Sequence, residues 1–349
     1  MKIRKRLTLI IGIVSIVMSV WGCSNTKPEV QNESKRVSDN SQFPKTIVDQ
    51  MGREVVIEEE PDSIVSGYYI STSALIALDQ ENKLVGIEND ADKRPVYGYS
   101  DPAIVELPSL GTVKEFDLEE CMTLNPDLVV VPTKLSGIIS TLEDLGITVL
   151  VVNPENEQLL NEMIYMLAQA TGAEEMASQI VAYKTEKLDE LQRLIQKEEK
   201  PSVYLAGNSS LLSTSGPCMY QNTLIENAGA VNVAADIEDT YWAEVSYEQI
   251  LTWNPEYIFI AADAGYGVEE VFADENLASC DAVKNKKVYK LPNITEPVDS
   301  PVPASFLGSL YMANVIRPEI YSWEQYEEAF VQFYENFYQF KPELKDTNE

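Results

Sequence analysis

Histidine is absent from all 349 residues of the chain. That absence removes the usual general base, the commonest zinc ligand and the commonest haem ligand at once. Nucleophile-elbow, phosphate-loop and HExxH zinc motifs are missing too, and Gly265-Tyr266-Gly267 lacks the spacing of a dinucleotide fingerprint. The sequence therefore argues against an enzyme, and we expect no catalytic residue, no resident metal and no cofactor.

Positive charge is scarce: 26 Lys and Arg stand against 56 Asp and Glu, which gives a formal charge of −30. A surface this negative repels phosphate backbones and anionic lipid headgroups. We therefore expect no nucleic-acid partner.

Cysteine is also rare. Apart from Cys23, the chain has Cys121, Cys218 and Cys280, an odd number without CxxC or zinc-site spacing. No disulfide framework is indicated. Cys121 falls among apolar residues of a predicted helix and is expected to be buried, whereas Cys218 lies in a Gly/Pro loop.

Residues 1–22 have the pattern of a secretory signal peptide, a basic start followed by a short apolar run. The run is too short for a lasting transmembrane helix. Val20-Trp21-Gly22-Cys23 resembles a bacterial lipobox, in which the cysteine thiol receives a diacylglycerol. We predict an exported chain anchored through Cys23 to the extracytoplasmic face of the cell membrane; a plain secretory signal is the alternative. Residues 23–44 are polar and aperiodic, as in a flexible tether.

The rest of the chain alternates apolar strands with helices, which predicts parallel sheets covered on both faces. Residues 45–173 form one predicted α/β lobe and residues 201–345 a second. Residues 174–200 contain no proline or glycine and repeat apolar residues at helical spacing, so they predict one connecting helix of roughly 40 Å. The predicted fold class is α/β, with two lobes joined by a single long helix.

An internal repeat supports two lobes. Residues 119–131 align with residues 248–260, with Glu, Thr, Asn and Pro identical at matching places. Each copy predicts a short helix stopped by Asn-Pro and followed by a buried strand, with Asp117 and Ser246 as the capping residues. The offset of 129 residues (248 − 119) is about the length of one lobe. A chance match between two helix–strand units is the alternative.

Ligands of open parallel sheets bind beyond the carboxyl ends of the strands, and the loops predicted there are rich in aromatic side chains. Basic residues on first-lobe loops, among them Lys93, suit an anionic ligand, and Arg94 suits a bidentate grip on a carboxylate or catecholate. Ordinary loop anchors and isolated solvated charges are the alternatives. The candidate ligand-binding residues are Tyr68, Tyr69, Arg94, Tyr97, Lys114, Lys134, Ser215, Tyr220, Trp242 and Tyr266.

Glu119 and Glu248 occupy the same place in the two repeats, in the first turn of a short helix. Helix-start preference alone explains either residue. As a pair, they suggest two matched negative groups, one per lobe, that dock on two arginines of a dimeric partner.

Five segments, taken in order, resemble the class III substrate-binding proteins of ABC importers, which handle iron-siderophores, haem and cobalamin. Three of them are Asp-Gln-Met-Gly-Arg-Glu-Val from residue 49, Leu-Asn-Pro-Asp-Leu-Val-Val from residue 124 and Ser-Tyr-Glu-Gln-Ile-Leu from residue 246. The other two are Ala-Val-Lys-Asn-Lys-Lys-Val-Tyr from residue 282 and Ser-Pro-Val-Pro-Ala-Ser-Phe-Leu-Gly from residue 300. The resemblance spans about residues 45–340.

The resemblance implies two Rossmann-like lobes with limited hinge motion and a monomer that delivers its solute to an ABC permease dimer. Glu119 and Glu248 match the family's glutamates that bind permease arginines, and Trp242 falls near a cleft tryptophan of the cobalamin branch. The implied ligand is an iron-siderophore or related metal chelate, with cobalamin, another corrinoid or haem as alternatives, although the lack of histidine excludes His-ligated haem. A surface enzyme on the same scaffold and a lipoprotein adhesin are the competing functions.

Overall fold

The computed structural model describes residues 43–237 and 242–344. The predicted signal peptide, Cys23 and most of the predicted tether lie outside the described residues. Phe43 already packs against the hydrophobic core, so the folded part begins two residues before the predicted boundary at 45. None of the helices in the described ranges has the length and apolar character needed to cross a membrane.

The first lobe is built around a four-stranded parallel sheet in the order β4-β3-β7-β8. Its strands and helices are β1 (Lys45–Val48), β2 (Glu54–Ile57), β3 (Ile64–Ser66), α1 (Tyr69–Ala77), β4 (Leu84–Ile87), α2 (Pro95–Ser100), β5 (Gly111–Thr112), β6 (Glu115–Phe116), α3 (Leu118–Leu124), β7 (Leu128–Pro132), α4 (Ile139–Asp144), β8 (Thr148–Val152) and α5 (Glu157–Thr171).

Both faces of this sheet are buried, as its apolar strands predict. Leu128 and Val130 of β7 pack into one hydrophobic cluster, while Val129 and Val131 pack into another on the opposite face. This alternation follows from the two-residue period of a strand.

The connecting helix α6 (Glu174–Ile195) is shorter than predicted, because it ends five residues before Lys200. Ile195 is its last buried residue, and the polar residues 196–200 are exposed. With no further apolar side chain to bury, the helix gains nothing from continuing. At 1.5 Å per residue, its 22 residues span about 33 Å.

The second lobe has a mixed sheet in the order β12-β10-β9-β13-β14, with β11 also paired to β9. Its elements are β9 (Ser202–Ala206), β10 (Ser213–Ser215), α7 (Tyr220–Asn227), β11 (Val231–Asn232), β12 (Trp242–Glu244), α8 (Tyr247–Trp253), β13 (Tyr257–Ile260), α9 (Val268–Ala273), α10 (Asp281–Lys284), β14 (Val288–Lys290), α11 (Phe306–Ile316) and α12 (Trp323–Phe337).

One edge of this second sheet departs from the parallel arrangement that alternating strands and helices predict. Strand β10 runs antiparallel to both β9 and β12. Only residues 207–212 join β9 to β10, and a parallel pairing would need a crossover of about a dozen residues or more. The short connection therefore dictates the antiparallel direction.

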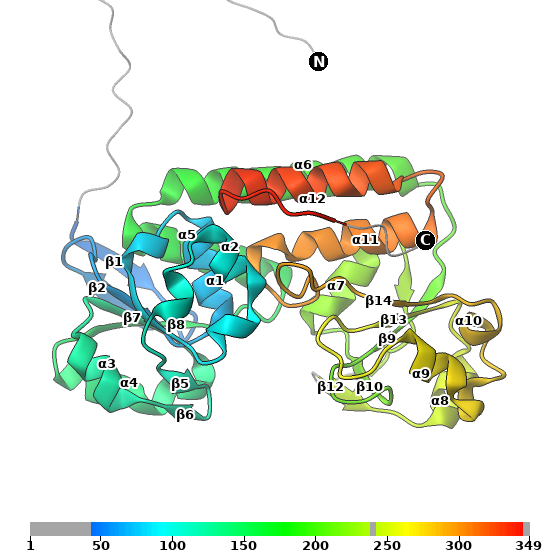
Figure 1. The fold of residues 1–349 in the computed structure, drawn as a ribbon, viewed down its shortest axis with the longest axis horizontal. Helices are drawn as coiled ribbons and strands as arrows, with labels where there is room; N and C mark the ends of the chain where they lie inside the picture. The colour runs from blue at the N-terminus through cyan, green and yellow to red at the C-terminus, as the bar shows by residue number, and fades with distance from the viewer. Residues whose placement is uncertain (1–42, 238–241, 345–349) are drawn as a thin grey trace, which may run out of the picture. The chain divides into compact units, whose positions relative to one another are not determined.

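One hydrophobic core continues from the first lobe into the second. It includes Leu160 of α5, Ile180 of α6, Leu224 of α7, Phe306 of α11 and Phe330 of α12. Figure 1 shows α6 and α12 lying side by side across both lobes, with α11 beneath them. The two lobes are thus joined by a packed layer of helices rather than by α6 alone.

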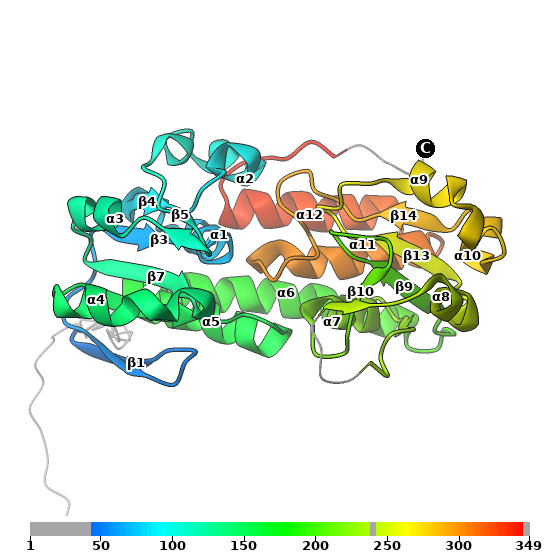
Figure 2. The same cartoon turned by 90° about the horizontal axis from the view of Figure 1, so that it is seen from below.

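The internal repeat is confirmed as two matching helix–strand units. Asp117 accepts a hydrogen bond from the backbone N–H of Glu120 (2.9 Å), and Ser246 accepts one from Gln249 (3.2 Å), so both helices have the predicted N-cap. Figures 1 and 2 place α3 in one lobe and α8 in the other, both on the side away from α6.

Candidate ligand site between the lobes

A cavity of about 260 Å³ lies between the two lobes. On the first-lobe side it is bounded by the chain that follows β4, and on the second-lobe side by the chain that follows β13 and β14. These are carboxyl ends of parallel strands, where the ligand crevice was predicted. The inter-lobe cavity is lined by Asp90, Lys93, Arg94, Pro95, Asp263, Asn293, Thr295, Glu296 and Pro297.

Arg94 is the central basic side chain of this cavity. The chain around it was predicted to be a loop, but Arg94 is the N-cap of α2, because Pro95 is preorganised for the first helical position. Its guanidinium carbon lies 4.0 Å from the centroid of the Tyr69 ring, and its Nε lies 3.4 Å from Oε1 of Glu88. A cation–π contact and an ion pair therefore fix the guanidinium without any ligand.

Glu88 is buried behind Arg94. Thr72 and Tyr97 each donate a hydroxyl hydrogen bond of 2.6 Å to its carboxylate. Burial raises the pKa of Glu88, and these hydrogen bonds together with Arg94 oppose that shift. Tyr97 has no exposed surface, so it supports Glu88 from behind and is not positioned for direct contact with a ligand.

Several hydrogen bonds cross between the lobes beside the cavity. The Tyr69 hydroxyl donates to Oγ of Ser300 (3.1 Å), and the N–H of Val96 donates to the carbonyl of Thr295 (3.0 Å). Ser73 donates to the buried carboxylate of Glu296 (2.7 Å). Burial raises the pKa of Glu296 and raises that of Tyr69 to about 12. This network holds the two lobes together at the cavity.

Two acidic residues of the second lobe, Asp263 and Asp299, interact electrostatically with each other, and Asp263 also interacts with Arg94. Asp263 lines the cavity, and Asn293 donates a hydrogen bond of 2.6 Å to its carboxylate. Burial raises the pKa of Asp263, whereas Arg94 and Lys290 lower it. Asp299 is fully buried, and burial, reinforced by the Asp263 carboxylate, raises its pKa to about 7.

The loop that carries Asp299 is pinned to α11 by a close backbone approach. A Cβ on Gly308 would lie 2.7 Å from the carbonyl oxygen of Val298. Glycine is therefore required at this helix position, and the approach explains why the family motif at residues 300–308 ends in glycine.

Three predicted aromatic residues remain near the ends of the strands with partial exposure. Tyr68 packs edge-on against Tyr69 at 5.2 Å between ring centroids. The Tyr266 hydroxyl donates to the carbonyl of Gly207 (2.8 Å), and the Trp242 ring lies over Gly207, where a Cβ would come within 2.8 Å of it. The Trp242 side chain is 39% exposed. Direct ligand contact by these three aromatic residues remains a prediction.

Of the ten candidate ligand-binding residues, Arg94 alone is among those that line the cavity in the described ranges. Lys114 and Lys134 are exposed, and neither forms an ion pair within the described ranges. Tyr220 and Ser215 are buried, with the Tyr220 hydroxyl 2.7 Å from Ser305 Oγ. Thr240 and Tyr241, which precede Trp242, lie outside the described residues.

The acidic residues of the site were missed by sequence reasoning. Asp263 follows β13, and Glu296 and Asp299 follow β14, but none of the three was among the candidate ligand-binding residues. Glu88 could have been predicted as a site residue from the sequence. A charged residue directly after the apolar strand β4 must either reach solvent or be paired with polar groups.

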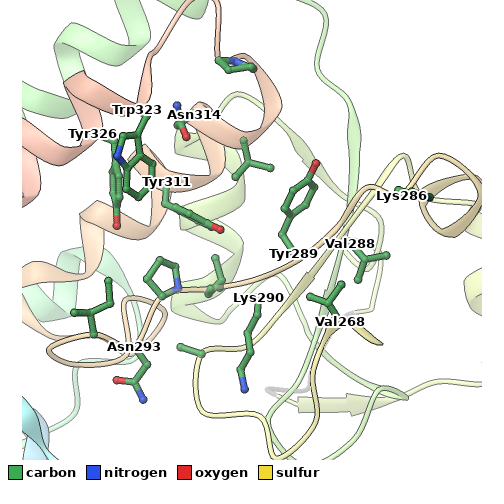
Figure 3. A pocket seen from close by; sticks show the side chains of 16 residues that line it. Val268, Lys286, Val288, Tyr289, Lys290, Asn293, Tyr311, Asn314, Trp323 and Tyr326 are labelled. Carbon is green, nitrogen blue, oxygen red and sulfur yellow. The ribbon is translucent and has the colours of Figure 1, made fainter. Parts of the chain in front are cut away.

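A larger cavity of about 860 Å³ lies within the second lobe, between β14 and the helices α11 and α12. Figure 3 shows Tyr311, Trp323 and Tyr326 on one side of the chain that leaves β14, and Lys290 and Asn293 pointing to the other side. All of its lining residues fall between Ala262 and Tyr326, so no first-lobe residue contributes to this cavity. It is separate from the inter-lobe site, although Asn293 borders both cavities.

Glu119 and Glu248 are exposed in the first turns of α3 and α8. Hydrogen bonds at the helix start, from its own backbone N–H and from Ser246, lower the pKa of Glu248. Both helices end at an asparagine in the left-handed conformation, Asn125 with φ 46° and Asn254 with φ 45°. The two carboxylates therefore project from equivalent positions of two matching helices, one on each lobe.

No group of three or more acidic or cysteine side chains within the described ranges could hold a metal ion. Cys121 and Cys280 are buried and Cys218 is exposed, and all three are free thiols.

Two α/β lobes that enclose a cavity between their strand ends define a two-lobed solute-binding protein. The chain belongs to the periplasmic binding protein family, which matches residues 64–295. It is an ABC transporter substrate-binding protein, and its family binds solutes rather than transforming them. The resemblance seen in the sequence is thereby confirmed.

The chain is similar to three curated proteins along most of its length. It is 29% identical to the ABC transporter substrate-binding lipoprotein YvrC of Bacillus subtilis, over 82% of this chain and 90% of YvrC. Identity is 24% to the molybdate-binding protein MolA of Haemophilus influenzae (85% and 92% covered) and 20% to the petrobactin-binding protein YclQ of Bacillus subtilis (82% and 89%). The solved structure of MolA bound to molybdate superposes with a TM-score of 0.76 at 22% identity, over 86% of this chain and 99% of MolA.

Proposed function

We propose that this chain is the exported, lipid-anchored solute-binding component of an ABC importer. In this proposal it captures an iron-siderophore or a related metal chelate in the inter-lobe cavity and delivers it to a permease dimer. The observation that carries the proposal is a cavity built from both lobes, with Arg94, whose guanidinium lies on the Tyr69 ring, on one wall and Asp263 on the other. A small solute in that position contacts both lobes at once, which couples binding to lobe closure.

Family membership supports the transport role but leaves the ligand open. MolA binds molybdate and YclQ binds petrobactin, so relatives of similar length carry chemically different solutes. The lipoprotein YvrC supports the proposed anchor at Cys23.

A corrinoid such as cobalamin is the second candidate. The partly exposed Trp242 at the start of β12 favours it, because a wide ring system can stack on an indole. Haem without a histidine ligand would bind by the same stacking.

Native mass spectrometry combined with titration of tryptophan fluorescence tests the proposal. The probes are ferric siderophores of several charges, cobalamin, haem and molybdate. We expect one molecule to bind reversibly to a monomer and to be recovered unchanged. Conversion of a bound probe into a product would instead support an enzyme on the same scaffold. An adhesin would bind none of the probes.

A further inference from the structure

Acidic groups outnumber basic ones around the inter-lobe cavity. Within the described ranges, three carboxyl groups interact electrostatically with Arg94, and a fourth interacts with Tyr69 and Asp263, whereas the cations that act on these four groups are Arg94 and Lys290. The four carboxyl groups are those of Glu88, Asp263, Glu296 and Asp299.

Both cations are already engaged by the protein. Arg94 is paired with Glu88 and also interacts electrostatically with Asp263 and Glu296. The Lys290 ammonium donates to the carbonyls of Ala264 (2.7 Å) and Tyr266 (3.3 Å). An incoming anion would have to compete with the Glu88 carboxylate for Arg94 and with two backbone carbonyls for Lys290.

The other lysines of the first-lobe loops, Lys93, Lys114 and Lys134, do not make the cavity positively charged. Lys93 borders the cavity, but its ammonium lies 2.7 Å from Oδ1 of Asp90 and its side chain is 70% exposed. Lys114 and Lys134 are exposed to solvent, where salt screens their charge.

Asp263 is the acidic group best placed to meet a ligand. It lines the cavity and, unlike Glu296 and Asp299, keeps an exposed side chain. Asn293 donates to one of its oxygens, which leaves further acceptor positions on the carboxylate for a ligand. The face of the Tyr69 ring, on which the Arg94 guanidinium already lies, attracts a cation and not an anion.

Resting on the proposed function, we infer that the inter-lobe cavity takes an uncharged or cationic chelate and rejects oxyanions and polyanionic chelates. Asp263 is the specificity-determining residue, because its carboxylate repels a negative ligand and accepts hydrogen bonds from a positive one. Arg94 orients Tyr69 and balances Glu88 rather than gripping a carboxylate or catecholate.

Isothermal titration of the full chain at low salt tests this inference with four probes. They are a monocationic ferric trihydroxamate, cobalamin as the uncharged metal complex, a trianionic ferric tris-catecholate, and molybdate. We expect the cationic or the uncharged probe to bind at least about tenfold more tightly than either anion. Tighter binding of the tris-catecholate or of molybdate would overturn the inference while leaving the proposed function standing. Absence of binding by all four would contradict the proposed function itself.

The variant Asp263→Asn gives a second readout that does not depend on which probe binds best. Removal of this charge should improve binding of the anionic probes by about tenfold, weaken the cationic probe by a similar factor and leave the uncharged one unchanged. Glu269→Gln, which removes an exposed carboxylate of α9 outside the cavity lining, is the matched control. If the two variants change the affinities of all probes equally, the net negative charge of the protein determines the selectivity. Asp263 would then not be the specificity-determining residue.

Discussion

At the scale of single residues, Arg94 is held from several directions before any ligand arrives. The Tyr69 ring lies under its guanidinium, and Glu88 faces its Nε from behind. Thr72 and Tyr97 in turn hold Glu88. Preorganisation of this kind lowers the ordering cost of binding, because the side chain need not be fixed by the ligand.

Trp242 carries the first residue-level prediction. We expect Trp242→Ala to weaken ligand binding by about 1–3 kcal/mol, since an aromatic ring that packs on a ligand contributes on that scale. Isothermal titration with whichever of the four probes binds the unaltered chain measures the loss. Trp323→Phe, in α12 outside the inter-lobe cavity, should leave the affinity unchanged. Unaltered affinity of Trp242→Ala would remove this residue from the site.

Asp299 carries a prediction about pH. Burial and the nearby Asp263 raise its pKa to about 7, against about 3.9 in an unfolded chain. The folded protein therefore holds this proton more tightly, so the contribution to stability is full below about pH 4 and is lost as pH rises through about 7. We expect urea unfolding to show lower stability at pH 8 than at pH 5, with about 2–3 kcal/mol of the difference from this group.

The variant Asp299→Asn removes the titrating group and should flatten that pH dependence. Glu88 and Glu296 shift in the same direction, so part of the slope should persist. Asp189→Asn, at an exposed position of α6, should keep the full slope. If Asp299→Asn and Asp189→Asn behave alike, Asp299 titrates near its ordinary range.

The sequence predicted the loops of the site better than the charges within them. Tyr69 and Arg94 could be chosen because their types and their places after strands suit a cleft. The pairing of Arg94 with Glu88, and its closeness to Asp263 of the other lobe, depend on how two distant segments pack. Local pattern carries no information about such contacts, so the anionic ligand predicted from Arg94 and the lysines took no account of the neighbouring acids.

At the scale of elements, the ends of α3 and α8 were predicted correctly, because caps mark both ends in the sequence. Asp117 and Ser246 begin the helices, and Asn-Pro stops them. The end of α6 at Ile195 was harder to predict, since residues 196–200 have good helix propensity but no apolar partner. The direction of β10 was set by the length of its connection rather than by its composition.

The two asparagine caps give an element-level prediction. Asn125 and Asn254 adopt positive φ, which glycine tolerates at least as well and alanine does not. Asn125→Ala should cost about 1 kcal/mol of stability, while Asn125→Gly should be nearly neutral. Asn254 also exchanges two hydrogen bonds with Asp281, at 2.8 and 2.9 Å, so Asn254→Gly should cost about 1 kcal/mol more than Asn125→Gly. Urea unfolding of the variants measures the difference, and equal costs for both glycine variants would contradict it.

At the scale of the whole described chain, the paired glutamates give a prediction about transport. The double variant Glu119→Ala with Glu248→Ala should keep ligand affinity within about twofold, because neither residue lines the cavity, yet should abolish uptake in cells. The matched control is Glu175→Ala with Glu324→Ala, which removes two exposed first-turn glutamates of α6 and α12. The control should transport normally. Loss of affinity in the purified double variant, or normal uptake, would contradict the docking role.

The continuous core limits how the two lobes can move. Leu160, Ile180, Leu224 and Phe306 belong to one packed cluster that a wide hinge opening would have to break. Small rotations that leave this cluster intact are the motions that remain.

Because Glu119 and Glu248 stand on opposite lobes, far from the shared helical layer, even a small rotation changes the spacing between them. A receptor with two arginines at a fixed separation would fit one spacing better than another. The membrane complex could then distinguish the ligand-bound protein from the empty one by the distance between the two glutamates alone, without contacting the ligand.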